Sequence, residues 1–191
     1  MRKLLIPALL CLLIACKSNE KKTDSEKDQV DSAATAPPES APPGMVDQPP
    51  GMVVLQLGNL KLGQPSGEVA EALGEPDSRS KAQEWGADGL MHEEWSWKEK
   101  GLVINFASEK GNTEIGRTVF SITARAPSDL KTMAGIGVGN TEDEVREAYK
   151  KEINQEESGD DQLIIGSMYG GIIFTLKDKK VVSVFLGAAA E

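Results

Sequence analysis

Histidine, cysteine and aromatic residues are scarce in this chain of 191 residues, which holds one histidine, two cysteines and 5% aromatic residues. Cys11 and Cys16 lie near the start, so the rest of the chain cannot form an internal disulfide. Little material remains for thiol, histidine-based or zinc catalysis, and we expect no metal and no other cofactor. Acidic residues outnumber basic ones by 30 to 21. The net charge of −9 argues against nucleic acid as a partner, because phosphate binding needs a basic surface.

The first sixteen residues have the layout of a bacterial export signal. Arg2 and Lys3 precede an apolar run, 4–15, that is too short to span a bilayer comfortably. The motif Leu-Ile-Ala-Cys at 13–16 resembles the lipobox of bacterial lipoproteins. The resemblance implies removal of a signal peptide, 1–15, and attachment of lipid to Cys16, where several acyl chains would give a stable anchor. The alternative is an ordinary secretory signal in which Cys16 is a chance thiol.

The residue after the lipidated cysteine bears on which membrane receives the protein. Position 17 is Lys, whereas Asp at this place tends to retain enterobacterial lipoproteins in the inner membrane. By the same resemblance we expect a lipid-anchored protein of the cell envelope, in the outer membrane and facing the periplasm. The inner membrane remains the alternative.

Residues 16–50 are predicted to be the lipidated cysteine followed by a disordered tether. The stretch 17–50 is charged at first and then rich in Pro, Ala and Ser, and it contains no aromatic residue, no Ile and no Leu. Such a stretch cannot bury enough apolar surface to fold, and its prolines stiffen it. Aliphatic residues become frequent from Gly51 onward, so a folded domain of about 140 residues is expected to begin there.

Two segments that lie 76 positions apart read alike. Residues 60–73 and 136–149 are identical at five of fourteen aligned positions, and three short apolar segments follow each of them. Such self-similarity indicates a repeated structural unit. We therefore expect an α+β fold of two tandem units, 51–127 and 128–191, each a short helical segment packed on a three-stranded antiparallel sheet.

The helices of these units have local signals. Thr141 followed by Glu144 is a capping box, which satisfies unpaired backbone donors at a helix start. Pro65 suits a position at the start of the first helix, and Gly74 suits its end. Apolar residues recur at helical spacing, so each helix should bury one stripe, namely Val69, Ala72 and Leu73 or Val145, Ala148 and Tyr149.

The apolar segments alternate with a period of two, as strands do, and so divide their side chains between two faces. The face expected to pack under the helices carries Trp95, Trp97, Leu102, Ile104, Phe106, Ile172, Phe174 and Leu176. The opposite face is mostly small and polar, as is typical of an antiparallel sheet with one solvated side. It is expected to carry Ser96, Val103, Asn105, Ser121, Thr123, Ile173, Thr175 and Ser183.

The Gly-Gln-Pro-Ser-Gly-Glu-Val helix start at 63–69, the Leu-Gly-Glu-Pro stop at 73–76 and the Trp-bearing hairpin resemble the BamE/SmpA-like superfamily of bacterial envelope proteins. The tandem form is similar to the beta-lactamase inhibitor protein, which binds its target on the sheet face. The resemblance implies that this chain binds protein through the same face. The candidate protein-binding residues are Trp85, Val103, Asn105, Thr123, Ile173 and Thr175.

The search for catalytic or metal-binding motifs is largely negative. His92 has no second histidine beside it, and its neighbours Glu93 and Glu94 point to opposite faces of a strand, so a solvated strand residue is favoured over a metal ligand or a base. The glycine-rich segment 135–140 lacks the third glycine and the Gly-Lys-Ser/Thr of nucleotide loops. The acidic segment 156–161 lacks the ligand spacing of an EF-hand, and a solvated loop is favoured over a calcium contact.

These observations favour a non-enzymatic, membrane-anchored lipoprotein that binds another envelope protein or assists envelope assembly. The alternative is a proteinaceous inhibitor that covers a periplasmic or cell-wall hydrolase with its sheet face. A third hypothesis is an enzyme or small-ligand binder that uses the acidic residues. The sequence leaves the identity of the partner and the oligomeric state open.

The lipid anchor can be tested with one substitution. In Cys16→Ser the sulfur that would carry diacylglycerol is gone, so incorporation of radiolabelled palmitate should fall to background. Lys17→Ser, next to the modified residue, should retain the label and serves as the control. Label that persists on Cys16→Ser would contradict the anchor.

Overall fold

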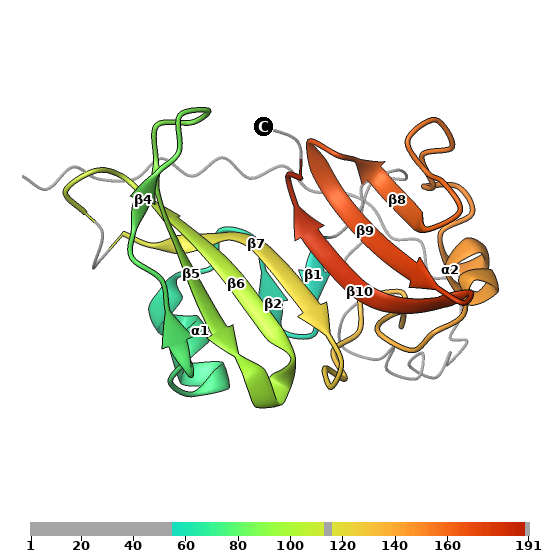
Figure 1. The fold of residues 1–191 in the computed structure, drawn as a ribbon, viewed down its shortest axis with the longest axis horizontal. Helices are drawn as coiled ribbons and strands as arrows, with labels where there is room; N and C mark the ends of the chain where they lie inside the picture. Colours follow the sequence, from blue (N-terminus) through green and yellow to red (C-terminus); the bar gives the residue numbers. More distant parts are fainter. Residues whose placement is uncertain (1–54, 113–115, 190–191) are drawn as a thin grey trace, which may run out of the picture. The chain divides into compact units, whose positions relative to one another are not determined.

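The computed structural model of the protein describes residues 55–112 and 116–189 (Figure 1). The predicted signal peptide 1–15, the lipid attachment at Cys16 and the tether up to residue 50 lie outside the described residues. The described part contains two short α-helices and a series of strands. The elements in chain order are β1 (Gln56–Leu57), β2 (Leu60–Lys61), α1 (Ser66–Leu73), β3 (Ser78–Arg79), β4 (Gln83–Glu84), β5 (Met91–Trp97), the 3-10 turn η1 (Lys98–Lys100), β6 (Leu102–Ser108), β7 (Thr118–Arg125), α2 (Glu142–Ala148), β8 (Gln162–Ser167), β9 (Gly170–Lys177) and β10 (Lys180–Gly187).

The strands from β3 to β10 form one antiparallel sheet of eight strands. Its order is β3-β5-β6-β7-β10-β9-β8, and β4 pairs with β5 outside that path. The two central strands, β7 and β10, pair from Ser183 with Arg125 to Leu186 with Ile122. The prediction of two tandem units, each a helical segment on its own three-stranded sheet, is therefore wrong. The described part is mostly β, and pairing β7 with β10 removes two exposed strand edges and joins β3 to β10 into one sheet, while β1 and β2 pair separately.

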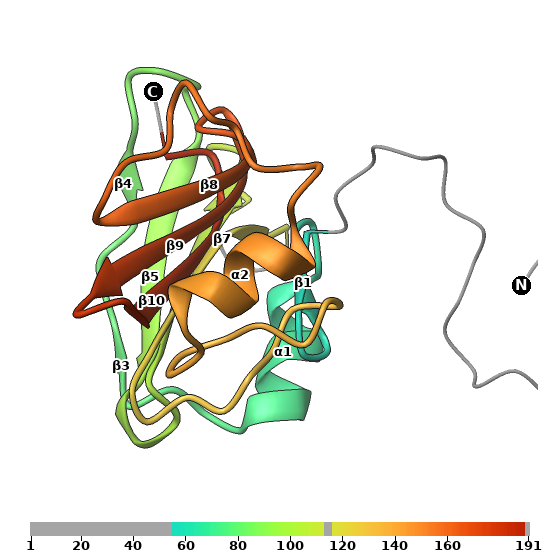
Figure 2. The same cartoon turned by 90° about the vertical axis from the view of Figure 1, so that its right-hand side faces the viewer.

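Both helices lie on the same face of this sheet, as Figure 2 shows. α1 follows Pro65 and ends at Gly74, and α2 begins with the capping box of Thr141 and Glu144, as predicted. Each helix buries a central valine, which packs in one core cluster with both halves of the sheet. The buried stripe of each helix is narrower than predicted, because Ala72 and Ala148 are exposed. Helices of eight and seven residues have only two turns, which leaves room for few inward positions. The central valines are Val69 and Val145.

The core face of the sheet carries the residues that the alternation predicted. Trp95, Trp97, Leu102, Ile104, Phe106, Ile172, Phe174 and Leu176 are all buried there. Aromatic rings meet in both halves: the Trp95 and Phe106 ring centres are 4.6 Å apart, and those of Tyr149 and Phe174 are 5.7 Å apart. The Tyr149 hydroxyl donates to Thr132 Oγ1 at 2.6 Å, and burial raises the pKa of that hydroxyl. The apolar core is thus continuous from α1 to α2.

Both edges of the sheet are covered by other parts of the chain. Along β8, Asn154 N–H donates to Ile164 O at 2.8 Å and Gly166 N–H donates to Glu152 O at 3.1 Å. Along β5, Ser80 N–H donates to Glu94 O at 2.8 Å, and the short strands β3 and β4 pair beside it. Covered and interrupted edges resist the addition of a further strand. The face opposite the helices is therefore the accessible broad surface of the sheet.

A core substitution in one half can test whether the sheet unfolds as one unit. Phe174 on β9 is fully buried, and Phe174→Ala should lower the free energy of unfolding by about 3–5 kcal/mol. All three tryptophans of the chain lie between residues 85 and 97, in the other half of the sheet. Because the core is shared, the unfolding transition followed by tryptophan fluorescence should shift to a lower denaturant concentration, and the free energy of unfolding derived from it should fall by the same 3–5 kcal/mol, roughly.

The neighbouring residue supplies a matched control for this measurement. Thr175 is exposed on the opposite face, so Thr175→Ala should change stability by no more than about 0.5 kcal/mol. A tryptophan transition that is unchanged in Phe174→Ala, while circular dichroism shows a second and earlier transition, would mean that the halves unfold independently.

Candidate functional site

The face opposite the helices brings the predicted binding residues together. Residues that pair directly on neighbouring strands point to the same side of a sheet. Val103 pairs with Thr123, Thr123 with Phe185, Phe185 with Ile173, and Ile173 with Ile164. These five residues form a continuous row across β6, β7, β10, β9 and β8, which we call the central row. It crosses the β7–β10 pairing and so belongs to both halves of the sheet.

The other predicted binding residues lie beside this row. Asn105 pairs with Ser121 on the side of the row nearer β4, and Thr175 pairs with Ser183 on the other side. Thr175 is exposed and Asn105 is half-buried. Trp85 belongs to no strand and lies in a turn over the end of the same face. The structure thus places all six predicted residues on this face or above it.

Phe185 was missed by sequence reasoning. It lies on β10, which runs to Gly187, and it was not among the residues predicted for either face. The signal was present, because Ser183, Val184, Phe185 and Leu186 alternate between the faces. Phe185 is half-buried and holds the middle of the central row, next to Thr123 and Ile173.

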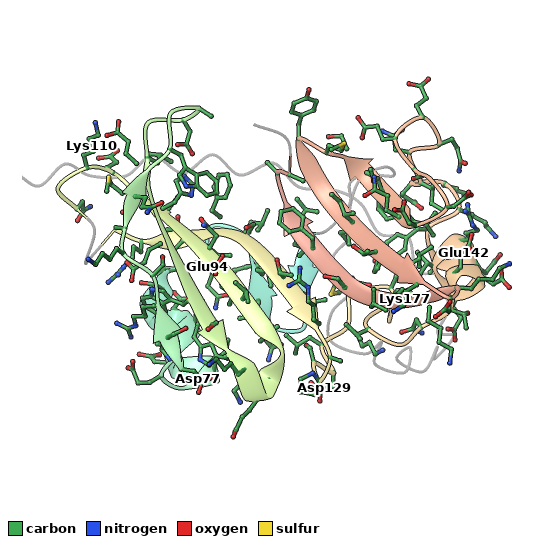
Figure 3. All side chains as sticks on the ribbon, viewed as in Figure 1. Asp77, Glu94, Lys110, Asp129, Glu142 and Lys177 are labelled. Carbon is green, nitrogen blue, oxygen red and sulfur yellow. The ribbon has the colours of Figure 1, made fainter. Side chains whose placement is uncertain are left out.

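Two hollows open on this face. The first, which we call the apolar hollow, has a volume of about 180 Å³ and lies at the end of β5, β6 and β7. The residues that line it are Ser96, Trp97, Lys98, Gly101, Leu102, Val103, Thr123 and Arg125. The second, the polar hollow, has a volume of about 260 Å³ and lies beneath the segment that covers the edge of β5. Its lining comes from Ser80, Lys81, Gln83, Trp85, His92, Glu94 and Asn105. Glu94 is labelled on the sheet in Figure 3.

His92 forms the floor of the polar hollow and is not a solvated strand residue, so that sequence-based prediction is wrong. Its residue is only 3% exposed. The Trp85 ring stacks on the imidazole with centres 3.7 Å apart and an angle of 5° between the planes. Phe120 meets the same imidazole edge-on, with centres 4.7 Å apart. Two aromatic rings from different segments therefore enclose the imidazole.

Both ring nitrogens of His92 have hydrogen-bond partners. Nδ1 lies 2.7 Å from Asn105 Oδ1, and Nε2 lies 2.9 Å from the Asp88 carboxylate. A carboxylate and an amide oxygen are both acceptors, and only the imidazolium form offers them two N–H donors. Both ring nitrogens already have partners within the protein, so neither faces free space where a metal ion or substrate could meet it.

The turn at residues 85–90 places Trp85 and Asp88 over the sheet. Gly89 N–H donates to Trp85 O at 2.9 Å, and Trp85 N–H donates to Leu90 O at 3.0 Å. Asp88 Oδ1 accepts from Leu90 N–H at 2.9 Å. This hydrogen bond, with a further contribution from His92, holds the pKa of Asp88 below its ordinary value. Asp88 is therefore a carboxylate at neutral pH and supplies a counter-charge to the ring.

Glu93 follows His92 on β5, is buried on the core face of the sheet and has a different set of partners. Glu93 is 9% exposed, accepts from Trp95 Nε1 at 2.7 Å and forms an ion pair with Arg117. As predicted, Glu93 and Glu94 point to opposite faces, since Glu94 is exposed. The Arg117–Glu93 pair lies beneath the sheet, where it ties the start of β7 to β5.

The acidic segment 156–161 lies beside the edge strand β8 and is held by hydrogen bonds to it and to its flanking residues. Glu156 and Glu157 donate their backbone N–H groups to Asn154 Oδ1, and the Glu157 carboxylate accepts from Met168 N–H at 3.0 Å. Within residues 55–112 and 116–189, no three His, Cys, Asp or Glu side chains are grouped so that they could hold a metal ion. No helix in those ranges is long and apolar enough to cross a membrane.

Comparisons with models of protein families, with curated proteins and with solved structures return no match for this chain. The resemblance to the BamE/SmpA-like superfamily thus stays a sequence-based prediction.

The lowered pKa of Asp88 predicts how acid affects the turn. A carboxylate whose folded pKa is depressed adds stability that is fully present above its unfolded value near 3.8 and is lost as the pH falls through the folded value. Asp88→Asn should be less stable than the wild type near pH 5, and the difference should shrink as the pH falls from about 5 to about 2. Denaturant unfolding over this range measures the difference.

A second aspartate provides the control. Asp160 is exposed on the acidic segment and takes part in no ion pair among the residues that the structure describes, so Asp160→Asn should track the wild type as the pH falls. A difference between Asp88→Asn and the wild type that stays constant or grows in acid would contradict the assigned role of the carboxylate.

Proposed function

We propose that this protein binds another protein of the cell envelope through the open face of its sheet, without catalysing a reaction. The observation that carries the proposal is the central row, which joins Val103, Thr123, Phe185 and Ile173 across both halves of the sheet. Apolar and small side chains at the centre, with polar side chains around them, are the usual arrangement of a protein interface.

The covered edges support a face rather than an edge as the binding surface. A partner strand could not add to β8 without displacing the backbone bonds from Asn154 and Gly166. It could not add directly to β5 either, since residues 78–84 already lie there. Partners that bind sheets by adding a strand need free backbone groups at an edge. The side chains of the open face are then the remaining contacts that the sheet offers.

The sizes of the two hollows favour a protein over a small molecule. They measure about 180 and 260 Å³, and both are below the range of about 300–1,000 Å³ that is usual for small-molecule sites. Each is large enough for a single side chain, and interfaces commonly place such anchoring side chains in pockets at their centre. The expected lipid anchor and tether would hold this face near other envelope proteins, which raises its effective concentration for them.

Site-specific cross-linking can test the proposal. A photoreactive residue at Thr123 or Thr175 should capture the partner in intact envelopes, whereas the same residue at Glu71, exposed on α1, should not. Thr175→Arg should reduce capture through Thr123 at least about tenfold, because a bulky charge then sits beside the central row. The Glu71→Arg variant is the matched control for added charge and should leave capture unchanged.

The captured protein also separates the two functional hypotheses. A component of envelope assembly supports an accessory role, and a hydrolase whose activity falls on binding supports an inhibitor. Equal capture from Thr123 and Glu71, or capture that Thr175→Arg leaves intact, would reject the open face as the binding surface.

A further inference from the structure

We infer that a proton on His92 latches the turn at residues 85–90 onto the open face, and that loss of this proton releases the turn. The latch would control access to the part of the face around Asn105 and Phe120. This inference deepens the proposed function and rests on it for its biological use, because the latch lies on the same face. The latch itself is a property of the isolated chain, and the contacts of the His92 ring support it.

The ring joins the turn at residues 85–90 to three strands of the sheet. His92 is on β5, Asn105 on β6 and Phe120 on β7, whereas Trp85 and Asp88 belong to the turn. Trp85 stacks on the imidazole, and Asp88 bonds to it at 2.9 Å. The turn is held further by the ladder of β4 with β5, in which Gln83 pairs with His92 and Glu84 with Met91. A two-residue strand is a marginal attachment, so the ring contacts are a large part of what fixes the turn.

The donors and acceptors explain why the proton matters. With the imidazolium, both ring N–H groups donate, one to Asn105 Oδ1 and the other to Asp88. A neutral ring keeps one N–H and leaves a nitrogen lone pair facing an oxygen in a buried position. That repulsive contact costs free energy, because an unsatisfied buried polar group loses its solvation without a replacement. The neutral ring can avoid this cost if the Asn105 amide turns over or if the turn moves away.

Two further contacts weaken when the charge is lost. The face of an indole ring is the negative end of its quadrupole, so the cationic form of a stacked imidazole is attracted to Trp85 more strongly than the neutral form. The Asp88 carboxylate also loses the opposite charge that it faces. Burial disfavours the charged ring, whereas the indole face and the two acceptors, one of which is the Asp88 carboxylate, favour it.

The other charged groups near the ring leave Asp88 as its specific partner. Lys81 and Glu94 line the polar hollow at its rim. Glu84 on β4 is paired with Lys110 at 2.7 Å, and both of those side chains are largely exposed. From β6 and β7 the groups that contact the ring are the uncharged Asn105 and Phe120.

The latch should therefore close in an intermediate range of pH. It requires both an ionised Asp88 and a protonated His92. Since closing takes up one proton, the equilibrium constant for closing should fall by at most about tenfold for each unit by which the pH rises. The lowered pKa of Asp88 delays the loss of the latch on the acid side.

The three indole N–H groups of the full chain in detergent micelles report this equilibrium by NMR. The Trp85 signal is identified by its absence in Trp85→Phe, and the signals of the buried Trp95 and Trp97 serve as internal references. As the pH is raised and the ring loses its proton, the heteronuclear NOE of Trp85 and of the backbone amides of residues 85–90 should fall, because a released turn moves on the nanosecond scale. The references should not change.

Two variants, one that removes the pH dependence and one that moves it to higher pH, test the role of the proton. His92→Phe keeps a ring for Trp85 to stack on but cannot bind a proton, so the NOE of the turn should be independent of pH. Asn105→Asp presents only oxygens to Nδ1 and adds a negative charge, so release should move to higher pH by about one unit, a tenfold change in the closing constant. In wild type a shift of the Trp85 frequency without a fall in its NOE would show protonation without release and would overturn the inference. The same holds for pH-dependent release that persists in His92→Phe.

The cross-linking test keeps this inference separate from the proposed function. If Thr123 and Thr175 capture a partner with a yield that does not depend on pH, and the turn does not move, the binding face stands and the latch fails. If the turn moves with pH but no residue of the face captures a partner, the latch stands and the proposed function fails.

Discussion

The backbone pairing of β7 with β10 is the interaction on which the rest of the structure depends. Four residue pairs join the last strands of the two halves. Without them each strand would expose a row of unpaired backbone groups, and two small sheets would each need a core of their own. With them, residues from both halves share one core beneath both helices, and the central row runs across the join. The binding face we propose exists only because the two halves are one sheet.

Strand β5 gives one end of this face its distinct chemistry. His92 and Glu93 are successive residues buried on opposite sides of the sheet, and polar groups buried in this way are stable only when they have partners. Glu93 finds Trp95 and Arg117 beneath the sheet, and His92 finds Asn105 and the turn at 85–90 above it. The β5 end of the face is therefore polar, whereas the half-buried Phe185 and the 9% exposed Ile173 make the other end apolar, and Ile164 beside them is fully buried. A partner that covers both ends must match both.

Local patterns predicted much of the fold and part of the site. The capping box of α2, the limits of α1 and the core face of the strands follow from residue spacing over a few positions, and the structure confirms them. Alternation also placed Val103, Asn105, Thr123, Ile173 and Thr175 on the face away from the helices. The tandem-unit architecture was wrong because no local pattern states which strand lies beside β7. His92 was misjudged because its partners come from a turn, from β6 and from β7.

The sequence by itself determined which segments become helix or strand and which side of each strand turns inward. Those properties depend on the spacing of apolar residues along the chain and on caps and turns that act within a few residues. The tertiary structure alone decided that β7 meets β10, that the sheet edges are covered and that a turn closes over His92. Each of these is a contact between segments far apart in the chain, where hydrogen bonds and buried area outweigh local preference, and a single residue type does not reveal its distant partner.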